Sequence, residues 1–96
     1  MGVGGVGGPS AAQPMSAAAK PPQGYVKIGN TGVWSSQYAN NKNNFDCWIA
    51  GNKTADQIQT KLSGDQEGKQ FKVVRDSVSH TKAGTTFEIA MANPFK

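Results

Sequence analysis

Alternating apolar and polar residues near the C-terminus most constrain the fold of this chain. Phe87, Ile89 and Met91 alternate with polar or small residues, and this period of two is typical of a strand with one buried face. A second run, residues 69–78, is rich in β-branched residues, and the polar segment 79–84 that follows it ends in Gly. The pattern predicts an antiparallel hairpin over residues 70–91, with residues 79–84 as its loop.

The same period predicts which side chains of the first hairpin strand share a face. Phe71 and Val73 fall on one face, and Val74 and Val78 fall on the other. We therefore expect Val78 to point away from the face that carries Phe71 and Val73.

Residues 1–24 have a different composition from the rest of the chain. They hold six of the 12 glycines and four of the five prolines, no aromatic residue and a single charge, Lys20. Such a segment cannot bury enough apolar surface to offset the entropy of ordering it. We therefore expect a flexible Gly/Ala/Pro-rich arm over residues 1–24 and a single small globular domain over residues 25–96. A domain of about 70 residues is near the size at which one core is sufficient, so we expect a protein partner or self-association.

Three more strands and one helix are expected between the arm and the hairpin. The strands are predicted at residues 25–29, 33–38 and 45–50, from short apolar runs that turn residues separate. Thr54 and Gln57 match a capping box, which predicts that a helix begins after Thr54. Ala55, Ile58 and Leu62 then fall on one helix face, and Gly64 is expected to end the helix.

The order of these elements predicts an α+β fold. Short connections favour antiparallel pairing, so we expect a small antiparallel β-sheet of about five strands (β-β-β-α-β-β) with one short helix packed on a face. The alternative is a small all-β sandwich, in which the helix is only a crossing turn. Eight residues are expected in the core: Ile58, Leu62, Phe71, Val73, Phe87, Ile89, Trp48 and Ile49. Asn93-Pro94 is expected to end the last strand, and Phe95 to fold back over the edge of the core.

The residues that commonly carry catalysis or bind metals are few. Cys47 and His80 are the only Cys and His in the chain; Cys47 lies in an apolar run and His80 in the polar segment 79–84. We expect a buried structural thiol and a solvated imidazole, and no nucleophilic pair. Zinc usually takes four Cys or His ligands, and the glycines at residues 2–8 lack the Gly-Lys-Ser/Thr of a phosphate loop. We therefore predict a protein that is not an enzyme and has no cofactor, metal site or small-molecule substrate.

A basic and aromatic set of residues is the main candidate for partner binding. The net charge is +4, and single-strand nucleic-acid binders combine cations with aromatic stacking surfaces. The candidate partner-binding residues are Lys69, Lys72, Arg75, Lys82, Trp34 and Tyr38. Because Lys72 is an odd number of residues from Lys69 and Arg75, the cations are not expected to share one strand face. Trp34, Tyr38 and the adjacent Asn-rich segment 40–44 also resemble the rim of a glycan or membrane site.

These observations favour a non-enzymatic protein-interaction or structural assembly protein with a flexible N-terminal arm. Two settings fit this function: a virion component, whose arm lies between neighbouring subunits, and an exported bacterial protein, whose N-terminus is a secretion address. A single-stranded nucleic-acid-binding module is the alternative. No run approaches the roughly 18 to 20 apolar residues of a membrane span, and the N-terminus lacks the basic start of a standard signal peptide. We therefore expect a cytoplasmic location, a virion, or export without a standard signal peptide.

Overall fold

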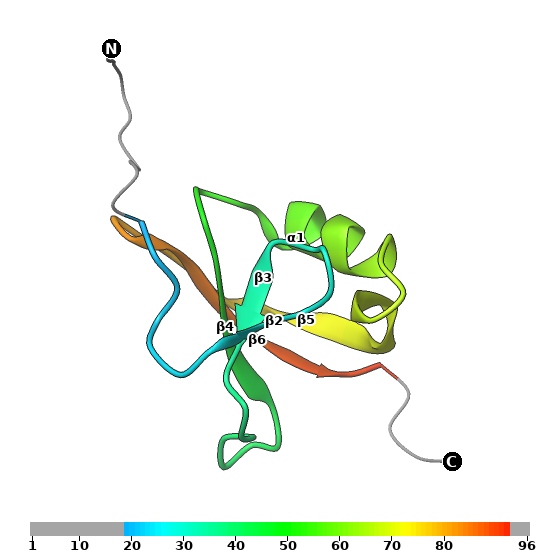
Figure 1. Cartoon of the computed structure of the whole chain (residues 1–96). Helices are drawn as coiled ribbons and strands as arrows, with labels where there is room; N and C mark the ends of the chain where they lie inside the picture. The colour runs from blue at the N-terminus through cyan, green and yellow to red at the C-terminus, as the bar shows by residue number, and fades with distance from the viewer. Residues whose placement is uncertain (1–18, 93–96) are drawn as a thin grey trace.

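A five-stranded antiparallel sheet with one helix on a face forms the fold, which confirms the predicted α+β class (Figure 1). The computed structural model describes residues 19–92, so most of the predicted arm, and Asn93, Pro94 and Phe95, lie outside the described residues. The strands are β2 (Val26–Lys27), β3 (Val33–Ser35), β4 (Phe45–Ile49), β5 (Phe71–Thr81) and β6 (Gly84–Met91); the helices are α1 (Ala55–Ser63) and a short 3₁₀ helix, η1 (Gly68–Gln70).

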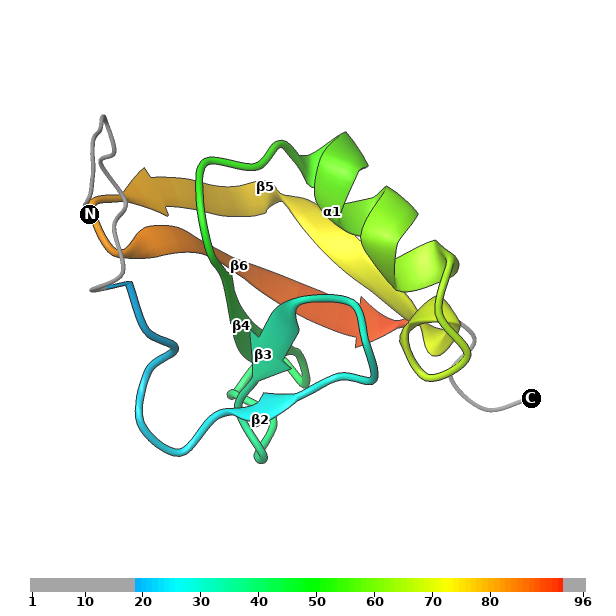
Figure 2. The same ribbon diagram turned by 45° about the horizontal axis from the view of Figure 1, so that its top comes forward.

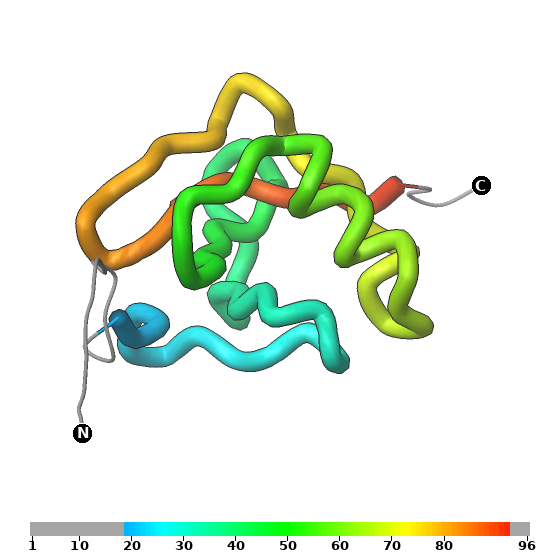
Figure 3. Tube along the Cα trace, turned by 90° about the horizontal axis from the view of Figure 1, so that it is seen from above, coloured from blue at the N-terminus to red at the C-terminus, as the bar shows by residue number. Residues whose placement is uncertain are grey.

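The strands lie in the order β2-β3-β4-β6-β5, and every neighbouring pair is antiparallel. Because β4 and β5 both pair with β6 in this way, β4 and β5 run parallel to each other. Two parallel strands need a crossover connection, and α1 with η1 supplies it. Figure 2 shows α1 lying over one face of the sheet, and Figure 3 shows the same arrangement from above. The sheet therefore has one face covered by the helix and one without it.

The helix begins where the sequence predicts. Thr54 is the N-cap: its side-chain oxygen accepts a hydrogen bond from the Gln57 amide (3.1 Å), and Gln57 Oε1 accepts one from the Thr54 amide (2.9 Å). This reciprocal pair confirms the capping box. Ile58 and Leu62 are fully buried, and the helix ends at Ser63 with Gly64 as its C-cap. The predicted apolar stripe is therefore the face that packs on the sheet.

The β5–β6 hairpin exists, but its connection is much shorter than predicted. Strand β5 runs to Thr81 and β6 starts at Gly84, so the turn is Lys82-Ala83 alone. Ser79 and His80, predicted to lie in the loop, pair with Thr86 and Thr85. Ser79 and His80 are exposed at the end of a long hairpin, so they can be polar although they belong to a strand. The polar composition of this segment therefore reflects exposure and does not indicate a loop.

Strand β5 carries a large bulge, and this makes the predicted position of Val78 wrong. Val74 pairs with Glu88, but Ser79 already pairs with Thr86, so β5 has three residues more than β6 between the two pairs. Ser77 stabilises the bulge: its hydroxyl donates to the Val74 carbonyl (2.6 Å) and accepts from the Glu88 amide (2.8 Å). The odd number of extra residues shifts the alternation, and Val78 packs against the core.

The predicted core is confirmed for seven of its eight residues, all of which are buried. Phe71 is half-buried instead, at the margin of the core. Trp48 is buried on the helix-free face, where its Nε1 donates to the Ala83 carbonyl (3.1 Å). Cys47 is buried as expected, and burial is the main reason that the pKa of its thiol rises to about 12.

The first two strands are shorter than the sequence suggests. The predicted strand 25–29 pairs only at Val26–Lys27, and the predicted strand 33–38 ends at Ser35. The backbone of Gly29 has a positive φ of 47°, which ends β2 and begins the turn to β3. A short β2 leaves part of the helix-covered face of the sheet open near its edge.

Candidate functional site

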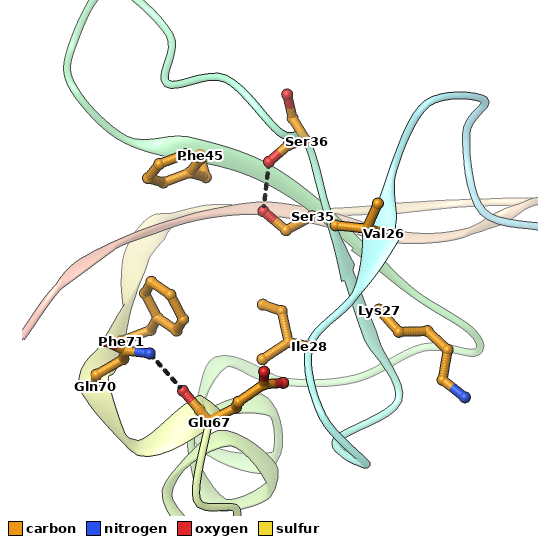
Figure 4. A pocket seen from close by; sticks show the side chains of 9 residues that line it. All are labelled: Val26, Lys27, Ile28, Ser35, Ser36, Phe45, Glu67, Gln70 and Phe71. Carbon is orange, nitrogen blue, oxygen red and sulfur yellow. Dashed lines mark hydrogen bonds between the residues drawn. The ribbon is translucent and has the colours of Figure 1, made fainter.

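An apolar groove lies where edge strand β2 faces the beginning of β5 (Figure 4). The groove has a volume of about 230 Å³, and four of its lining side chains are large and apolar: Val26, Ile28, Phe45 and Phe71. Phe45 and Phe71 lie on one side, and Val26 lies on the other with Ile28 between them. Polar groups complete the lining: Lys27, Ser35, Ser36, Glu67 and Gln70.

Three of the four apolar residues of the groove are only partly covered by the fold, and the fourth, Ile28, is buried. Val26 is 45% exposed, while Phe45 and Phe71 are half-buried beside the core. Phe71 pairs with Met91 in the neighbouring strand, and Met91 is 41% exposed. A contiguous group of exposed apolar side chains marks a surface that contacts other molecules more often than isolated ones do. The groove is therefore the strongest candidate for a binding site in the described residues.

A carboxylate holds the two sides of the groove in place. Asp65 Oδ1 accepts a hydrogen bond from the Asn30 amide (3.1 Å), and its Oδ2 accepts from the Glu67 amide (2.9 Å) and the Gly68 amide (3.2 Å). These bonds, with that from Asn30 the largest cause, lower the pKa of Asp65. A Cβ at Gly29 would collide with this carboxylate. The bonds connect the β2–β3 turn to the segment before β5, so the groove is preformed.

One side of the groove also offers backbone groups that have no hydrogen-bond partner within residues 19–92. The Ile28 amide donates to the Val33 carbonyl (2.9 Å), and Val26 is paired with Ser35. Because the direction of backbone groups alternates along a strand, the amide and carbonyl of Lys27 point away from β3. Among the strands that the structure describes, β2 is the end of the sheet, so another extended chain can pair with it at Lys27.

The opposite edge of the sheet, β5, is covered at its start by a helix side chain. Gln59 Nε2 donates to the Phe71 carbonyl (3.1 Å), and Gln59 Oε1 accepts from the Val73 amide (2.8 Å). The amide of Gln59 thus makes the two hydrogen bonds that a further strand would make. Farther along the same edge, His80 Nε2 is hydrogen-bonded to the Lys53 carbonyl (2.9 Å). The β5 edge is therefore blocked over residues 71–73, whereas no described side chain bonds to the outward backbone groups of Lys27.

The four candidate cations are not brought together. Lys69 lies in η1, Lys72 projects from β5 on the helix-free face, and Lys82 lies in the hairpin turn. Arg75 lies in the bulge and forms an exposed ion pair with Asp56 of α1 (2.8 Å). The register partners of Lys72 and Thr81 are Ala90 and Gly84, six residues apart on β6, so Lys72 and Lys82 lie at opposite ends of the hairpin, separated by roughly 20 Å. The cations therefore form no compact basic patch.

The two candidate aromatics lie in different surroundings. Trp34 is half-buried in β3, and its register partners are Lys27 in β2 and Trp48 in β4. Tyr38 follows β3 and is 82% exposed. Trp34 therefore belongs to the helix-free face of the sheet, whereas Tyr38 lies beyond the end of its strand.

The Asn-rich segment 40–44 makes its hydrogen bonds within the protein. Asn40 Oδ1 accepts from the amides of Lys42 (2.9 Å) and Asn44 (3.1 Å), and Asn40 Nδ2 donates to Asp46 (3.1 Å). Asn44 Nδ2 donates to Glu88 (3.1 Å), and this bond is the largest cause of the lowered pKa of Glu88. The side-chain amides of Asn40 and Asn44 are thus already engaged, which gives the glycan hypothesis no support from them.

Cys47 and His80 do not form a pair. Strand β6 separates β4 from β5, so two strand spacings, roughly 10 Å, lie between their backbones. Within residues 19–92, no group of three residues of the kinds that bind metals comes together. The geometry of these residues offers no nucleophile with its base.

Comparisons with protein-family models, with curated proteins and with solved structures find no match to this chain. Among the described helices, none has the length and apolar character that crossing a membrane requires. The function therefore has to be inferred from the geometry of the groove.

Proposed function

We propose that this protein is a non-enzymatic protein-interaction or assembly component that binds an extended, uncharged segment of another chain in the groove beside β2. One observation carries the proposal: the free backbone groups of Lys27 border an apolar groove. An extended chain paired with Lys27 gains main-chain hydrogen bonds and places alternate side chains against Val26 and Phe71. Assembly in a virion and the action of an exported bacterial protein are the two settings that we propose for this binding.

The chemistry of the groove favours an uncharged segment. Its four large side chains Val26, Ile28, Phe45 and Phe71 are apolar, and burying a charge against them without a partner costs several kcal/mol. Residues 1–24 of this same chain carry only one charge, Lys20, and otherwise consist mainly of small and apolar residues. The N-terminal segment of a second copy is therefore the first partner to test.

We expect this association to be weak in its isolated form. Strand β2 has only two residues, so the contact is short, whereas small stable interfaces bury roughly 1,200 Å². A spectroscopic titration that detects transient binding is therefore the suitable assay.

The test is an amide NMR titration of the full ¹⁵N-labelled chain with a synthetic peptide of residues 1–18. We expect saturable shifts at Val26–Ile28, Ser35 and Phe71. Val26→Ser should weaken binding, whereas the same change at Val74, which lies on the helix-free face, should not. Shifts that spread over the surface, or equal effects of the two variants, would refute the proposed function.

Single-stranded nucleic acid binding remains the alternative. Its support is the pairing of Lys27 with Trp34, which places a cation beside an aromatic residue on the helix-free face. Titration with a mixed-sequence oligonucleotide tests it. The alternative replaces our proposal if Lys72, Trp34 and their neighbours shift together and moderate salt reverses the shifts.

A further inference from the structure

We propose that Glu67 sets the direction and the charge pattern of the segment that binds beside β2. The segment runs antiparallel to β2, and a basic residue just before its uncharged stretch pairs with the Glu67 carboxylate. This role rests on the proposed function and deepens it, because it names the partner chemistry: an extended uncharged stretch that follows Lys or Arg. Three features support it: the position of Glu67, its charge and the pairing geometry at Lys27.

Glu67 lies at the end of the groove where β2 stops. The carboxylate of Asp65 accepts hydrogen bonds from both the Asn30 amide (3.1 Å) and the Glu67 amide (2.9 Å). Asn30 comes two residues after Ile28, so Glu67 lies at the C-terminal end of β2. Figure 4 shows the Glu67 side chain beside Ile28, among the residues that line the groove.

The Glu67 carboxylate has no charge partner within residues 19–92. Neither of the ion pairs that the structure describes includes it, and its side chain accepts no described hydrogen bond. Because side chains alternate along a strand, Lys27 points to the helix-free face, opposite to Ile28 and the groove. An exposed negative charge thus borders an apolar groove, and a cation on the bound chain is its electrostatic complement.

The outward backbone groups of Lys27 favour an antiparallel partner. In an antiparallel pair, the one residue opposite Lys27 exchanges both hydrogen bonds with it, whereas a parallel partner bonds through two different residues and pairs less stably. In the described part of the chain, β2 extends the contact in neither direction. The Tyr25 amide already donates to the Pro22 carbonyl (3.2 Å), and the positive φ of Gly29 ends the strand.

This register places the basic residue of the partner. With position 0 of the partner opposite Lys27, positions −1 and +1 lie opposite Ile28 and Val26 and face the groove. Position −3 faces the same way and lies level with Asn30, whose amide shares a carboxylate with the amide of Glu67. A Lys at position −3 therefore reaches Glu67, while apolar side chains at −1 and +1 fill the groove.

Two blocked peptides of identical composition test this register. In acetyl-Lys-Gly-Val-Thr-Val-Gly-amide the lysine precedes the apolar residues, and in acetyl-Gly-Val-Thr-Val-Gly-Lys-amide it follows them. Each is titrated into the full ¹⁵N-labelled chain and into Glu67→Gln. Asp76→Asn is the matched control, because Asp76 is exposed and does not line the groove. A nitroxide in place of the acetyl group of the first peptide reports the direction, since it broadens nearby amide signals.

We expect the first peptide to bind the unmodified chain and Asp76→Asn about two- to fivefold more tightly than the second, which is the effect of one exposed ion pair. The preference should vanish in Glu67→Gln and at about 1 M salt. The nitroxide should broaden the amide signals of Glu67 and Gly68 more than that of Tyr25.

The other outcomes separate this role of Glu67 from the proposed function. Equal affinities, tighter binding of the second peptide, a preference that survives in Glu67→Gln, or broadening centred on Tyr25 overturns the role of Glu67 alone. The role is also overturned alone if only the 1–18 peptide shifts the amides of the groove. If none of these peptides binds, the proposed function fails together with it.

Discussion

Replacing Gln59 by Met should open the β5 edge of the sheet and destabilise the fold. The side chain of Gln59 is part-buried and makes two hydrogen bonds to β5, one to the Phe71 carbonyl and one from the Val73 amide. Met has similar length and helix propensity but neither donor nor comparable acceptor, so the substitution removes the two bonds to β5 together with an exposed bond from Gln59 Nε2 to Ser63 Oγ (3.2 Å). A net hydrogen bond contributes about 1 kcal/mol, so the loss should be about 2 kcal/mol.

The assay is thermal or urea unfolding, followed by the fluorescence of Trp34 and Trp48. For a domain of this size, 2 kcal/mol corresponds to a fall in the melting temperature of about 10 °C. Hydrogen exchange gives a local readout: the Val73 amide should exchange faster in Gln59→Met than in the unmodified protein.

Gln66→Met supplies the matched control, because Gln66 is exposed and no described side-chain hydrogen bond involves it. If both variants unfold at the same temperature and the exchange of Val73 is unchanged, the strand-like role of Gln59 is wrong. If Gln59→Met also associates at higher concentration, through a β5 edge that is no longer blocked, the reasoning gains independent support.

Three further substitutions test contacts that stabilise the fold: the N-cap of α1, the close packing at Gly84 and the hydrogen bonds of Asp65. Thr54→Ala removes the capping box and should cost about 1 kcal/mol in unfolding free energy, measured by urea denaturation. Gly84→Ala should cost at least about 2 kcal/mol in the same assay, because φ is +145° and the new Cβ would collide with the Trp48 indole. The pKa of Asp65 is lowered in the folded state, and the bond from the Asn30 amide is the largest cause. The ionised Asp65 therefore stabilises the folded state above the unfolded pKa, about 4. This stabilisation is lost as the pH falls through the folded pKa. The free energy of unfolding should therefore be measured at a series of pH values for the unmodified protein and for Asp65→Asn. The difference between the two should be constant near neutrality and should disappear in acid.

The fold class and the helix were predictable because their signals are local. Thr54 and Gln57 are three residues apart, and their spacing predicts the N-terminus of α1 regardless of the rest of the chain. The alternation from Phe87 to Met91 likewise predicts a strand. Pairing between neighbours in sequence then follows from short connections.

The bulge and the closed edge were not predictable, because each depends on contacts across the fold. Ser77 and Gln59 are polar residues among other polar residues, and neither has a spacing that distinguishes it from a solvated side chain. Their roles appear only when β6 and β5 lie beside them. The insertion of β6 between β4 and β5 is equally non-local.

The candidate site illustrates the same limit. Val26, Phe45 and Phe71 have the apolar character of core residues, and nothing in their spacing shows that the fold leaves them half-covered. The basic residues were identified from their closeness in sequence, but an extended strand separates such residues by many ångströms. Cations close in sequence form a patch only where the backbone turns back on itself.

The closed β5 edge has a consequence for how large an assembly of this protein can become. A sheet with two open edges can add chains at both ends without limit, which is the geometry of a fibre. Gln59 occupies the start of one of these edges, at Phe71 and Val73, so among the described strands β2 is the edge that is open for pairing beside the groove, at Lys27. Edge-to-edge pairing through β2 would therefore stop at a closed pair.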